Sequence, residues 1–259
     1  MSSAQRYFVR LAYRGTHYRG WQRQPNDLPT VQQTIEETLS EVLRTPTTVV
    51  GCGRTDAGVH ASDYYLHFAG PPALRPNFVP ILNHRLPQDI RFLEAYPVAR
   101  TAHARYDATA RTYRYRLHTR PDPLANVISC YLPPGPLDVA AIHRAASFLP
   151  GHHDFRALCL TPDRHPTTDC TFTEATFDSS NPDRPYFQFT ANRFLRGMIR
   201  LLVWQLLAVG RGELKSAEVV QALRTGVRLT ARQAPPEGLT LTKVVYGEGA
   251  RTRVGSGAV

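Results

Sequence analysis

Two hydrophobic periods alternate along the chain, and this alternation limits the fold more than any other feature. Apolar residues recur at every second position from Tyr7 to Tyr13, as in a strand, and at helical spacing from Thr30 to Arg44. Thr30 can cap that helix, with Gln33 completing a capping box. Further strands are predicted over residues 47–52, 62–68, 109–119, 171–177, 187–190 and 239–245, and further helices over 79–84, 138–149, 194–209 and 215–223. This mixture predicts an α+β fold.

The length of 259 residues suits one large domain or two halves of about 100–150 residues each. We expect an N-terminal half over residues 1–105, which includes a loop at 51–61. We expect a C-terminal half over 106–249, which includes the strand at 109–119 and the helix at 194–209. Residues 250–259 are rich in Gly, Ser and Arg and are expected to form a flexible tail.

The charge of the chain favours a polyanionic partner. There are 31 Lys and Arg residues against 21 Asp and Glu residues, a formal net charge of +10. Arginine dominates the excess, and its planar fork matches phosphate and stacks on bases. Nucleic acid is therefore a candidate partner. A basic protein that binds no nucleic acid is the alternative.

An acidic residue lies on a glycine-rich loop between two predicted strands. The stretch VVGCGRTDAGVHA ends a β-rich run and then presents Arg54 and Asp56 among glycines. Glycine permits tight turns and a close approach by a second backbone segment, so Asp56 can face a cleft. The same Asp could instead cap its own turn. The start G-C-G-R-T-D lacks the third glycine and the following helix of a dinucleotide-binding motif.

The predicted helix at 194–209 carries arginine on an otherwise apolar surface. Arg193, Arg196 and Arg200 are spaced by three and four residues, which would place them on one helical face. Arg193 and Arg196 can extend to the surface. Arg200 lies deeper in the predicted helix and would need an anionic partner, for which Asp56 is a natural candidate. Such a pair would keep Asp56 ionised at neutral pH.

The strand ARTYRYRLH combines aromatic and basic residues. Its alternation puts Arg111, Tyr113, Tyr115 and Leu117 on one face and Thr112, Arg114, Arg116 and His118 on the other. The tyrosines could simply pack in a sheet. They could also form a platform for stacking a base, with arginines that bind phosphate beside it.

No cofactor or metal site is expected from the motifs. The chain has no phosphate-binding P-loop, no nucleophile elbow and no paired Cys or His ligand spacing, the pair His152–His153 included. The four cysteines show no C-x-x-C pair and are expected to be reduced, mostly buried thiols: Cys52, Cys130, Cys159 and Cys170. The N-terminus has no apolar signal region, and no apolar run is long enough to cross a membrane. A cytoplasmic protein is expected.

Several motifs of the chain resemble those of the TruA family of pseudouridine synthases. GRTDAGVHA is similar to the signature loop of that family, and AYRGTHYRGWQRQP is similar to its N-terminal motif. Further matches are Asn83, Leu86, Pro87, Asp89 and Ile90, the strand HARYDATARTYRYR, the segment NRFLRGMIRLLV and the closing APPEGLTL. The resemblance runs through most of the chain. Arg14 and Ala102 depart from the family pattern, and Arg14 stands where an Asp is usual after Tyr13.

The resemblance implies a role for five residues of this chain. Asp56 matches the catalytic aspartate, which acts as nucleophile or catalytic carboxylate, and Arg54 matches the arginine that helps to extrude the target base. Tyr113 matches the tyrosine that stacks on the uracil. Arg200 matches the arginine that pairs with the catalytic carboxylate, and Leu239 matches a leucine of the pocket.

The resemblance also implies a fold, a substrate and a partner. Two related α/β halves would join into one continuous mixed, largely antiparallel sheet, with helices on one side and a central basic cleft. The substrate would be uridine in the anticodon stem-loop of tRNA, at tRNA positions 38, 39 and 40, and the enzyme would be a homodimer that needs no cofactor. Two other functions stay open: a non-catalytic tRNA-binding or chaperone protein, and a metal-dependent RNA nuclease that uses Asp56 with Asp63.

Overall fold

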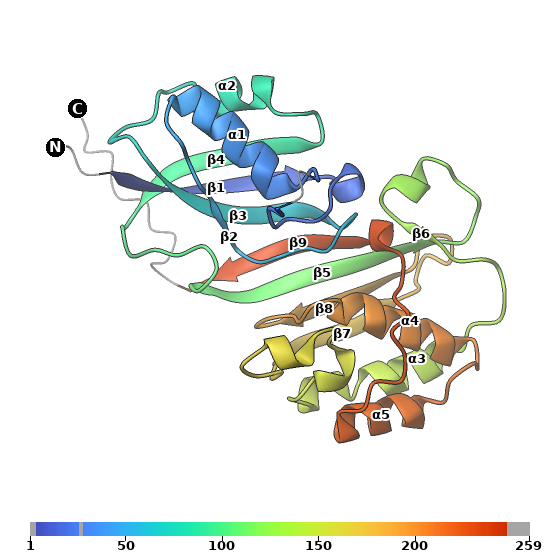
Figure 1. The fold of residues 1–259 in the computed structure, drawn as a ribbon. Coiled ribbons are helices and arrows are strands. Elements are labelled where there is room, and N and C mark those ends of the chain that lie inside the picture. Colours follow the sequence, from blue (N-terminus) through green and yellow to red (C-terminus); the bar gives the residue numbers. More distant parts are fainter. Residues whose placement is uncertain (1–3, 26–27, 248–259) are drawn as a thin grey trace. The chain divides into compact units, whose positions relative to one another are not determined.

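The computed structural model describes residues 4–25 and 28–247, so the expected tail at 250–259 lies outside the described residues. Two compact units make up the chain: residues 1–109 with 241–259, and residues 110–240. The described residues form nine strands and five α-helices (Figure 1). The predicted α+β class is therefore confirmed.

In the first unit the strands lie in the order β4-β1-β3-β9, with β2 beside β3. β1 pairs antiparallel with both β3 and β4, and β2 pairs antiparallel with β3. The strands are β1 (Gln5–Tyr13), β2 (Val50–Gly51), β3 (His60–Gly70), β4 (Ile90–Val98) and β9 (Leu239–Tyr246). β9 comes from the far end of the sequence, and its residues from Leu241 onward belong to this unit.

Two helices, α1 (Val31–Leu43) and α2 (Phe78–Arg85), lie on the same side of these strands (Figure 1). Thr30 caps α1 as predicted, because its Oγ1 accepts a hydrogen bond from the backbone N of Gln33 at 3.3 Å. The second half of the predicted capping box is wrong: over the described residues Gln33 Oε1 accepts no hydrogen bond, and the Gln33 amide nitrogen donates to Glu37 at 2.9 Å. The core between helices and sheet holds fully buried apolar side chains: Val9, Leu11, Ile35, Leu39, Tyr64, Leu66 and Phe68.

In the second unit the strands lie in the order β5-β8-β7, and β6 runs parallel to β5. Both β5 and β7 pair antiparallel with β8. The strands are β5 (Ala108–His118), β6 (Cys130–Tyr131), β7 (Phe172–Asp178) and β8 (Tyr186–Ala191). The helices α3 (Val139–Ala146), α4 (Met198–Gly210) and α5 (Ser216–Thr225) contact one another, and α3 packs on β7 (Figure 1).

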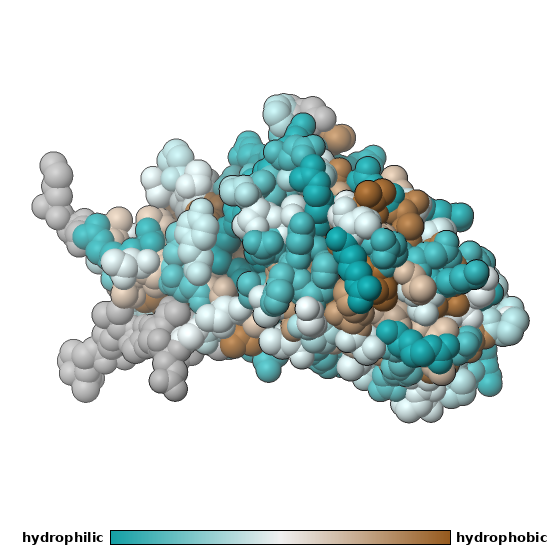
Figure 2. Space-filling model, turned by 90° about the horizontal axis from the view of Figure 1, so that it is seen from below, coloured by the Kyte–Doolittle hydropathy of each residue, from teal (hydrophilic) through white to brown (hydrophobic). Residues whose placement is uncertain are grey.

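Short 3₁₀ helices join these elements, at Gly15–His17, Ala125–Val127, Leu149–Gly151, Arg156–Leu158, Pro162–Arg164 and Pro236–Gly238. All four cysteines are free thiols, and three of them are buried. None of the helices in the described residues is both long and apolar enough to span a bilayer. Figure 2 shows a face of the molecule that is mainly hydrophilic, with smaller hydrophobic patches between the polar residues.

Two predicted elements differ from the observed ones. The strand predicted at 47–52 is reduced to Val50–Gly51. The helix predicted at 194–209 begins only at Met198, because Gly197 precedes it with a φ of +72°, a left-handed conformation that interrupts helical geometry. Arg193 and Arg196 therefore lie before the helix, and the prediction that they share a helical face with Arg200 is wrong.

Candidate functional site

The loop that carries Asp56 connects β2 to β3 and is packed closely at its start. A β-carbon on Gly51 would lie 2.7 Å from the indole ring of Trp21, so only glycine fits there. The hydroxyl of Tyr64 donates to the carbonyl oxygen of Gly53 at 2.5 Å, and the backbone N of Cys52 donates to the carbonyl oxygen of Tyr65 at 2.8 Å. The loop therefore leaves the sheet along a fixed path.

The residues around Asp56 are held by the segment Tyr18–Trp21. The carbonyl oxygen of Thr55 accepts from the backbone N of Trp21 at 3.1 Å, and the N of Gly58 donates to the carbonyl oxygen of Tyr18 at 3.2 Å. The N of Val59 closes the turn by donating to the carbonyl oxygen of Asp56 at 3.2 Å. These bonds fix the backbone on both sides of the carboxylate.

Side chains beneath the loop fix it further. The hydroxyls of Tyr13 and buried Thr55 are 2.8 Å apart and share a hydrogen bond. The Trp21 and Tyr64 rings stack at 4.2 Å with an interplanar angle of 29°. Asp56 is half-buried and Arg54 is exposed. The loop thus presents a carboxylate and a guanidinium from a hydrogen-bonded backbone, as preorganised catalytic groups require.

A glycine on the partner segment allows the close approach. Gly20 has a φ of +91°, and a β-carbon there would lie 2.7 Å from the carbonyl oxygen of Thr55. Tyr18 of the same segment donates to Asp89 at 2.7 Å, and burial together with this bond raises the pKa of Tyr18 above its usual value. The sequence marked these residues as motif positions only. Their supporting role depends on contacts between distant segments.

The departure at Arg14 leaves this support in place. Arg14 is exposed, and its backbone N donates to the carbonyl oxygen of Asp89 at 2.8 Å. That bond needs no particular side chain at position 14.

In the second unit Tyr113 lies on the helix-covered face of β5. Its ring meets that of Phe194 edge to face, with centroids 5.2 Å apart and an interplanar angle of 86°. The residue is 9% exposed. The ring is therefore held rigidly, with a small part of its surface open.

Arg200 lies in the first turn of α4, not deep within the helix as the sequence suggested. Its Nε donates to the carbonyl oxygen of Ala234 at 2.7 Å, and the backbone N of Ala234 donates to the carbonyl oxygen of Arg200 at 2.9 Å. Two bonds thus tie the side chain and backbone of Arg200 to the segment before β9.

Leu239 belongs to the same segment. It is the buried first residue of β9 and follows the 3₁₀ helix Pro236–Gly238. The hydroxyl of Tyr115 donates to the carbonyl oxygen of Pro235 at 2.9 Å, and a β-carbon on Gly238 would lie 2.6 Å from the Tyr115 ring. The segment 234–239 therefore connects Arg200 and Leu239 to β5, the strand of Tyr113.

The five candidate residues fall into two groups. Arg54 and Asp56 belong to the first unit, whereas Tyr113, Arg200 and Leu239 belong to the second. The predicted pair of Asp56 with Arg200 and the predicted cleft across both halves stay predictions.

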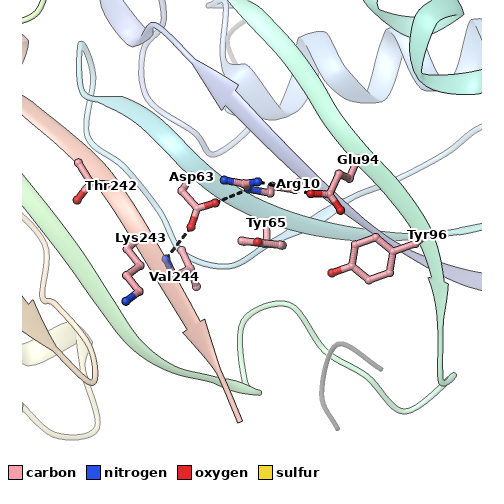
Figure 3. Close-up of a pocket in the computed structure, with 8 residues that line it drawn as sticks. All are labelled: Arg10, Asp63, Tyr65, Glu94, Tyr96, Thr242, Lys243 and Val244. Carbon is pink, nitrogen blue, oxygen red and sulfur yellow. Dashed lines mark hydrogen bonds and ion pairs between the residues drawn. The ribbon is translucent and has the colours of Figure 1, made fainter. Parts of the chain in front are cut away.

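A cavity of about 670 Å³ on the first unit has none of these five residues in its lining. Eight residues line it, as Figure 3 shows: Arg10, Asp63, Tyr65, Glu94, Tyr96, Thr242, Lys243 and Val244. The guanidinium of Arg10 lies between two carboxylates, 2.7 Å from Asp63 and 3.5 Å from Glu94. The other oxygen of Asp63 accepts from the backbone N of Val244 at 3.1 Å. Asp63 is therefore engaged in holding β9, which weakens its candidacy as a metal ligand beside Asp56.

The chain matches one family of known proteins over most of its length. Residues 11–107 and 145–247 match the sequence model of a family described as tRNA pseudouridine synthase. A protein of Porphyromonas gingivalis named tRNA pseudouridine synthase A is 40% identical over 248 residues, which cover 93% of this chain and 97% of that protein. Proteins of the same name from Bacteroides fragilis and Chlorobaculum tepidum are 40% and 38% identical, covering 94% and 92% of this chain and 97% and 96% of the relatives.

Proposed function

The chain belongs to the tRNA pseudouridine synthase family and is an isomerase that acts on uridine in tRNA, and on this premise we propose that Asp56 is its catalytic carboxylate. The observation that carries the proposal is the fixed loop. Hydrogen bonds at Thr55, Asp56, Gly58 and Val59 hold the backbone, while the Asp56 side chain stays half-buried. The surrounding sequence GRTDAGVHA is similar to the signature of the family.

The chemistry requires few protein groups. Isomerisation breaks the bond between C1′ and N1 of uridine and forms a bond between C1′ and C5. The hydrogen on C5 leaves and N1 gains one, so atoms and electrons balance without an oxidant or a second substrate. The target base must be taken out of the stack and held while it turns. A single carboxylate can then act as nucleophile or as base.

We assign supporting roles to four other residues. Exposed Arg54 fills the space that the extruded base vacates. The Tyr113 ring, held edge to face by Phe194, stacks on the uracil. Arg200, held by Ala234, keeps Asp56 ionised and oriented, and Leu239 lines the pocket.

The substrate site in tRNA and the assembly belong to the same proposal. By resemblance to its family, the enzyme modifies tRNA positions 38, 39 and 40 in the anticodon stem-loop and acts as a cytoplasmic homodimer. The net charge of +10 supports binding to a polyanion, and four free thiols fit a reducing compartment. Affinity for tRNA is then expected to fall with rising salt.

The substitution Asp56→Asn tests the catalytic role. Because C5 loses its hydrogen, release of tritium from tRNA that carries [5-³H]uridine measures turnover. We expect Asp56→Asn to bind tRNA and to release tritium at least about a thousandfold more slowly. Removal of a catalytic nucleophile or base lowers the rate by a factor of this order. Asp163→Asn is the matched control, since Asp163 is exposed and pairs with Arg156.

Turnover of Asp56→Asn close to that of the wild type would contradict the role. The same measurements separate the rival functions. A non-catalytic tRNA-binding protein would bind tRNA and release no tritium in any variant. A metal-dependent nuclease would cleave the RNA and stop in the presence of a chelator.

A further inference from the structure

A second cavity, of about 390 Å³, lies entirely within the second unit. It is bounded by β5, β8 and the segment that leads from β5 to β6. Its lining combines three arginines with apolar residues, a tyrosine and one carboxylate: Arg114, Arg116, Leu117, Asp122, Leu124, Ala125, Ile128, Ser129, Arg184 and Tyr186. None of the five candidate site residues is among them.

The guanidinium of Arg114 is fixed on the surface of the sheet. It lies over the ring of Tyr186, 4.2 Å from the centroid, and bonds to the Gln188 side-chain oxygen through Nε and Nη2 at 3.2 and 2.8 Å. The amide of Gln188 in turn donates to Glu174 at 2.8 Å. This network fixes the orientation of the Arg114 guanidinium before any ligand binds, which lowers the entropy that binding costs.

Arg116 is the least compensated charge in this cavity. It is half-buried, and its Nη1 donates to Thr240 Oγ1 at 3.0 Å. Over the described part of the chain, Arg116 forms no ion pair with a carboxylate. Burial and the neighbouring charge of Arg114 lower its pKa. A buried cation without a counterion is costly, and an anionic ligand would remove that cost.

The carboxylate of the cavity is already engaged. Asp122 pairs with Arg184 at 2.6 Å and accepts from the backbone N of Leu124 and Ala125 at 3.0 and 3.1 Å. The pair with Arg184 and these backbone bonds lower the pKa of Asp122. Among the lining residues, three guanidinium groups therefore face one carboxylate.

A further carboxylate, that of Asp178, lies outside the lining and near Arg114. Hydrogen bonds from Ser180, and then the charge of Arg114, lower the pKa of that carboxyl. Among the described residues, Arg116 therefore carries the positive charge that is left without a counterion.

Exposed apolar side chains adjoin the arginines. Leu124 is 84% exposed and Ile128 is 49% exposed, and both line the cavity. A nucleotide offers a phosphate for the guanidinium groups and an apolar sugar or base face for the leucine and isoleucine. The arginines of this lining are complementary to a phosphate, so charge complementarity favours RNA as the occupant.

We propose that this cavity binds one phosphodiester of the tRNA, with its nucleoside against Leu124 and Ile128, as an RNA contact additional to the catalytic loop. The proposal rests on the proposed function, because it names a further contact with the same substrate. Arg116 supplies the central charge, and Arg114 and Arg184 flank it.

The experiment measures tRNA binding and turnover in Arg116→Gln. Glutamine keeps a polar side chain and removes the charge. We expect the dissociation constant for unmodified tRNA to rise about 5- to 20-fold and the slope of log K against log salt to fall by about one, as for the loss of one phosphate contact. In turnover measurements, Arg116→Gln should raise KM by a larger factor than it lowers kcat.

Two matched variants accompany it. Arg116→Lys keeps the charge and should retain the salt slope, with lower affinity because it loses the planar fork. Arg144→Gln removes an exposed charge from α3, where Arg144 pairs with Asp138 at 3.7 Å, and should leave both the slope and KM as in the wild type. Thermal melting of each variant verifies folding.

Several outcomes would overturn the proposal. One is a salt slope and KM in Arg116→Gln equal to those of Arg144→Gln. Another is a change in oligomeric mass in Leu124→Ser at an unchanged KM, which would assign the cavity to a contact between copies. Failure of the proposed function is a separate result, since the wild type would then bind tRNA and release no tritium.

Discussion

At the scale of single residues, the environment of His67 links stability to pH. His67 is 6% exposed, and its Nδ1 accepts a hydrogen bond from the backbone N of Ala104 at 3.0 Å. Burial, and then the charges of Arg6 and His103, lower its pKa to about 4, while Asp107 acts in the opposite direction. The neutral ring is therefore part of the folded state.

The substitution His67→Gln should flatten the pH dependence of stability. Because the folded pKa lies below that of the unfolded chain, the contribution of His67 is complete above about pH 6.5 and is lost as the pH falls towards 4. For the wild type this amounts to about 2 kcal/mol between pH 7 and pH 5. Urea unfolding at both pH values should give a smaller decrease for His67→Gln, which has no titratable ring. An equal decrease in both proteins would refute the assignment.

At the scale of elements, a glycine decides where α4 begins and hence where Arg200 lies. Gly197 has a φ of +72°, and a β-carbon there would collide with Gln233 Nε2 and lie 2.7 Å from Leu160 Cδ1. Gly212, just after α4, has a similar φ of +74° but no atom within 4 Å of a β-carbon. Substitutions at the two positions therefore separate the cost of backbone strain, which both share, from the cost of crowding around the β-carbon, which only Gly197 has.

We expect Gly212→Ala to lower the free energy of unfolding by about 1 kcal/mol, the cost of a left-handed L-residue. Gly197→Ala should lower it by a further 1–3 kcal/mol or so, because the surrounding side chains must move. It should also slow turnover, since the first turn of α4 carries Arg200. Urea unfolding and tritium release measure the two effects. Equal losses in the two variants would show that crowding at Gly197 is unimportant.

At the scale of the whole molecule, the end of the sequence completes the sheet of the beginning. β9 lies beside β3, Val244 is bonded to Asp63, and the Tyr246 hydroxyl donates to the carbonyl oxygen of Ala104 at 2.6 Å. Leu241, Val244 and Tyr246 are buried. The first unit therefore cannot bury its core until the last strand has been made.

Truncation after Thr240 should prevent folding of the first unit. It removes these buried side chains and leaves β3 with an unpaired edge, which favours aggregation. Truncation after Gly247 removes no described residue and is the control. Soluble yield and circular dichroism during heating should separate the two proteins. A first unit that melts cooperatively without β9 would contradict this account.

The sequence by itself determined the features that depend on neighbours along the chain. The period of the apolar residues was enough for β1, α1, β5 and the α+β class, and the cap of α1 by Thr30 followed from local hydrogen bonding. The family was also evident from the sequence, because its motifs are contiguous. The assignment of Asp56 as the catalytic residue rests on the same motifs and stays a prediction.

Only the tertiary structure decided the features that depend on distant segments. Helical spacing predicted α4 from Phe194, but the left-handed Gly197, beside Leu160 and Gln233, delays it to Met198. Alternation predicted that Arg114 and Arg116 share a face, but only the packing of β8 and the segment 122–129 makes that face a cavity lined by three arginines and one carboxylate. The period of the apolar residues shows which side of a helix or strand is buried. A binding or catalytic site depends on which other elements pack beside that helix or strand, and the period does not contain this information.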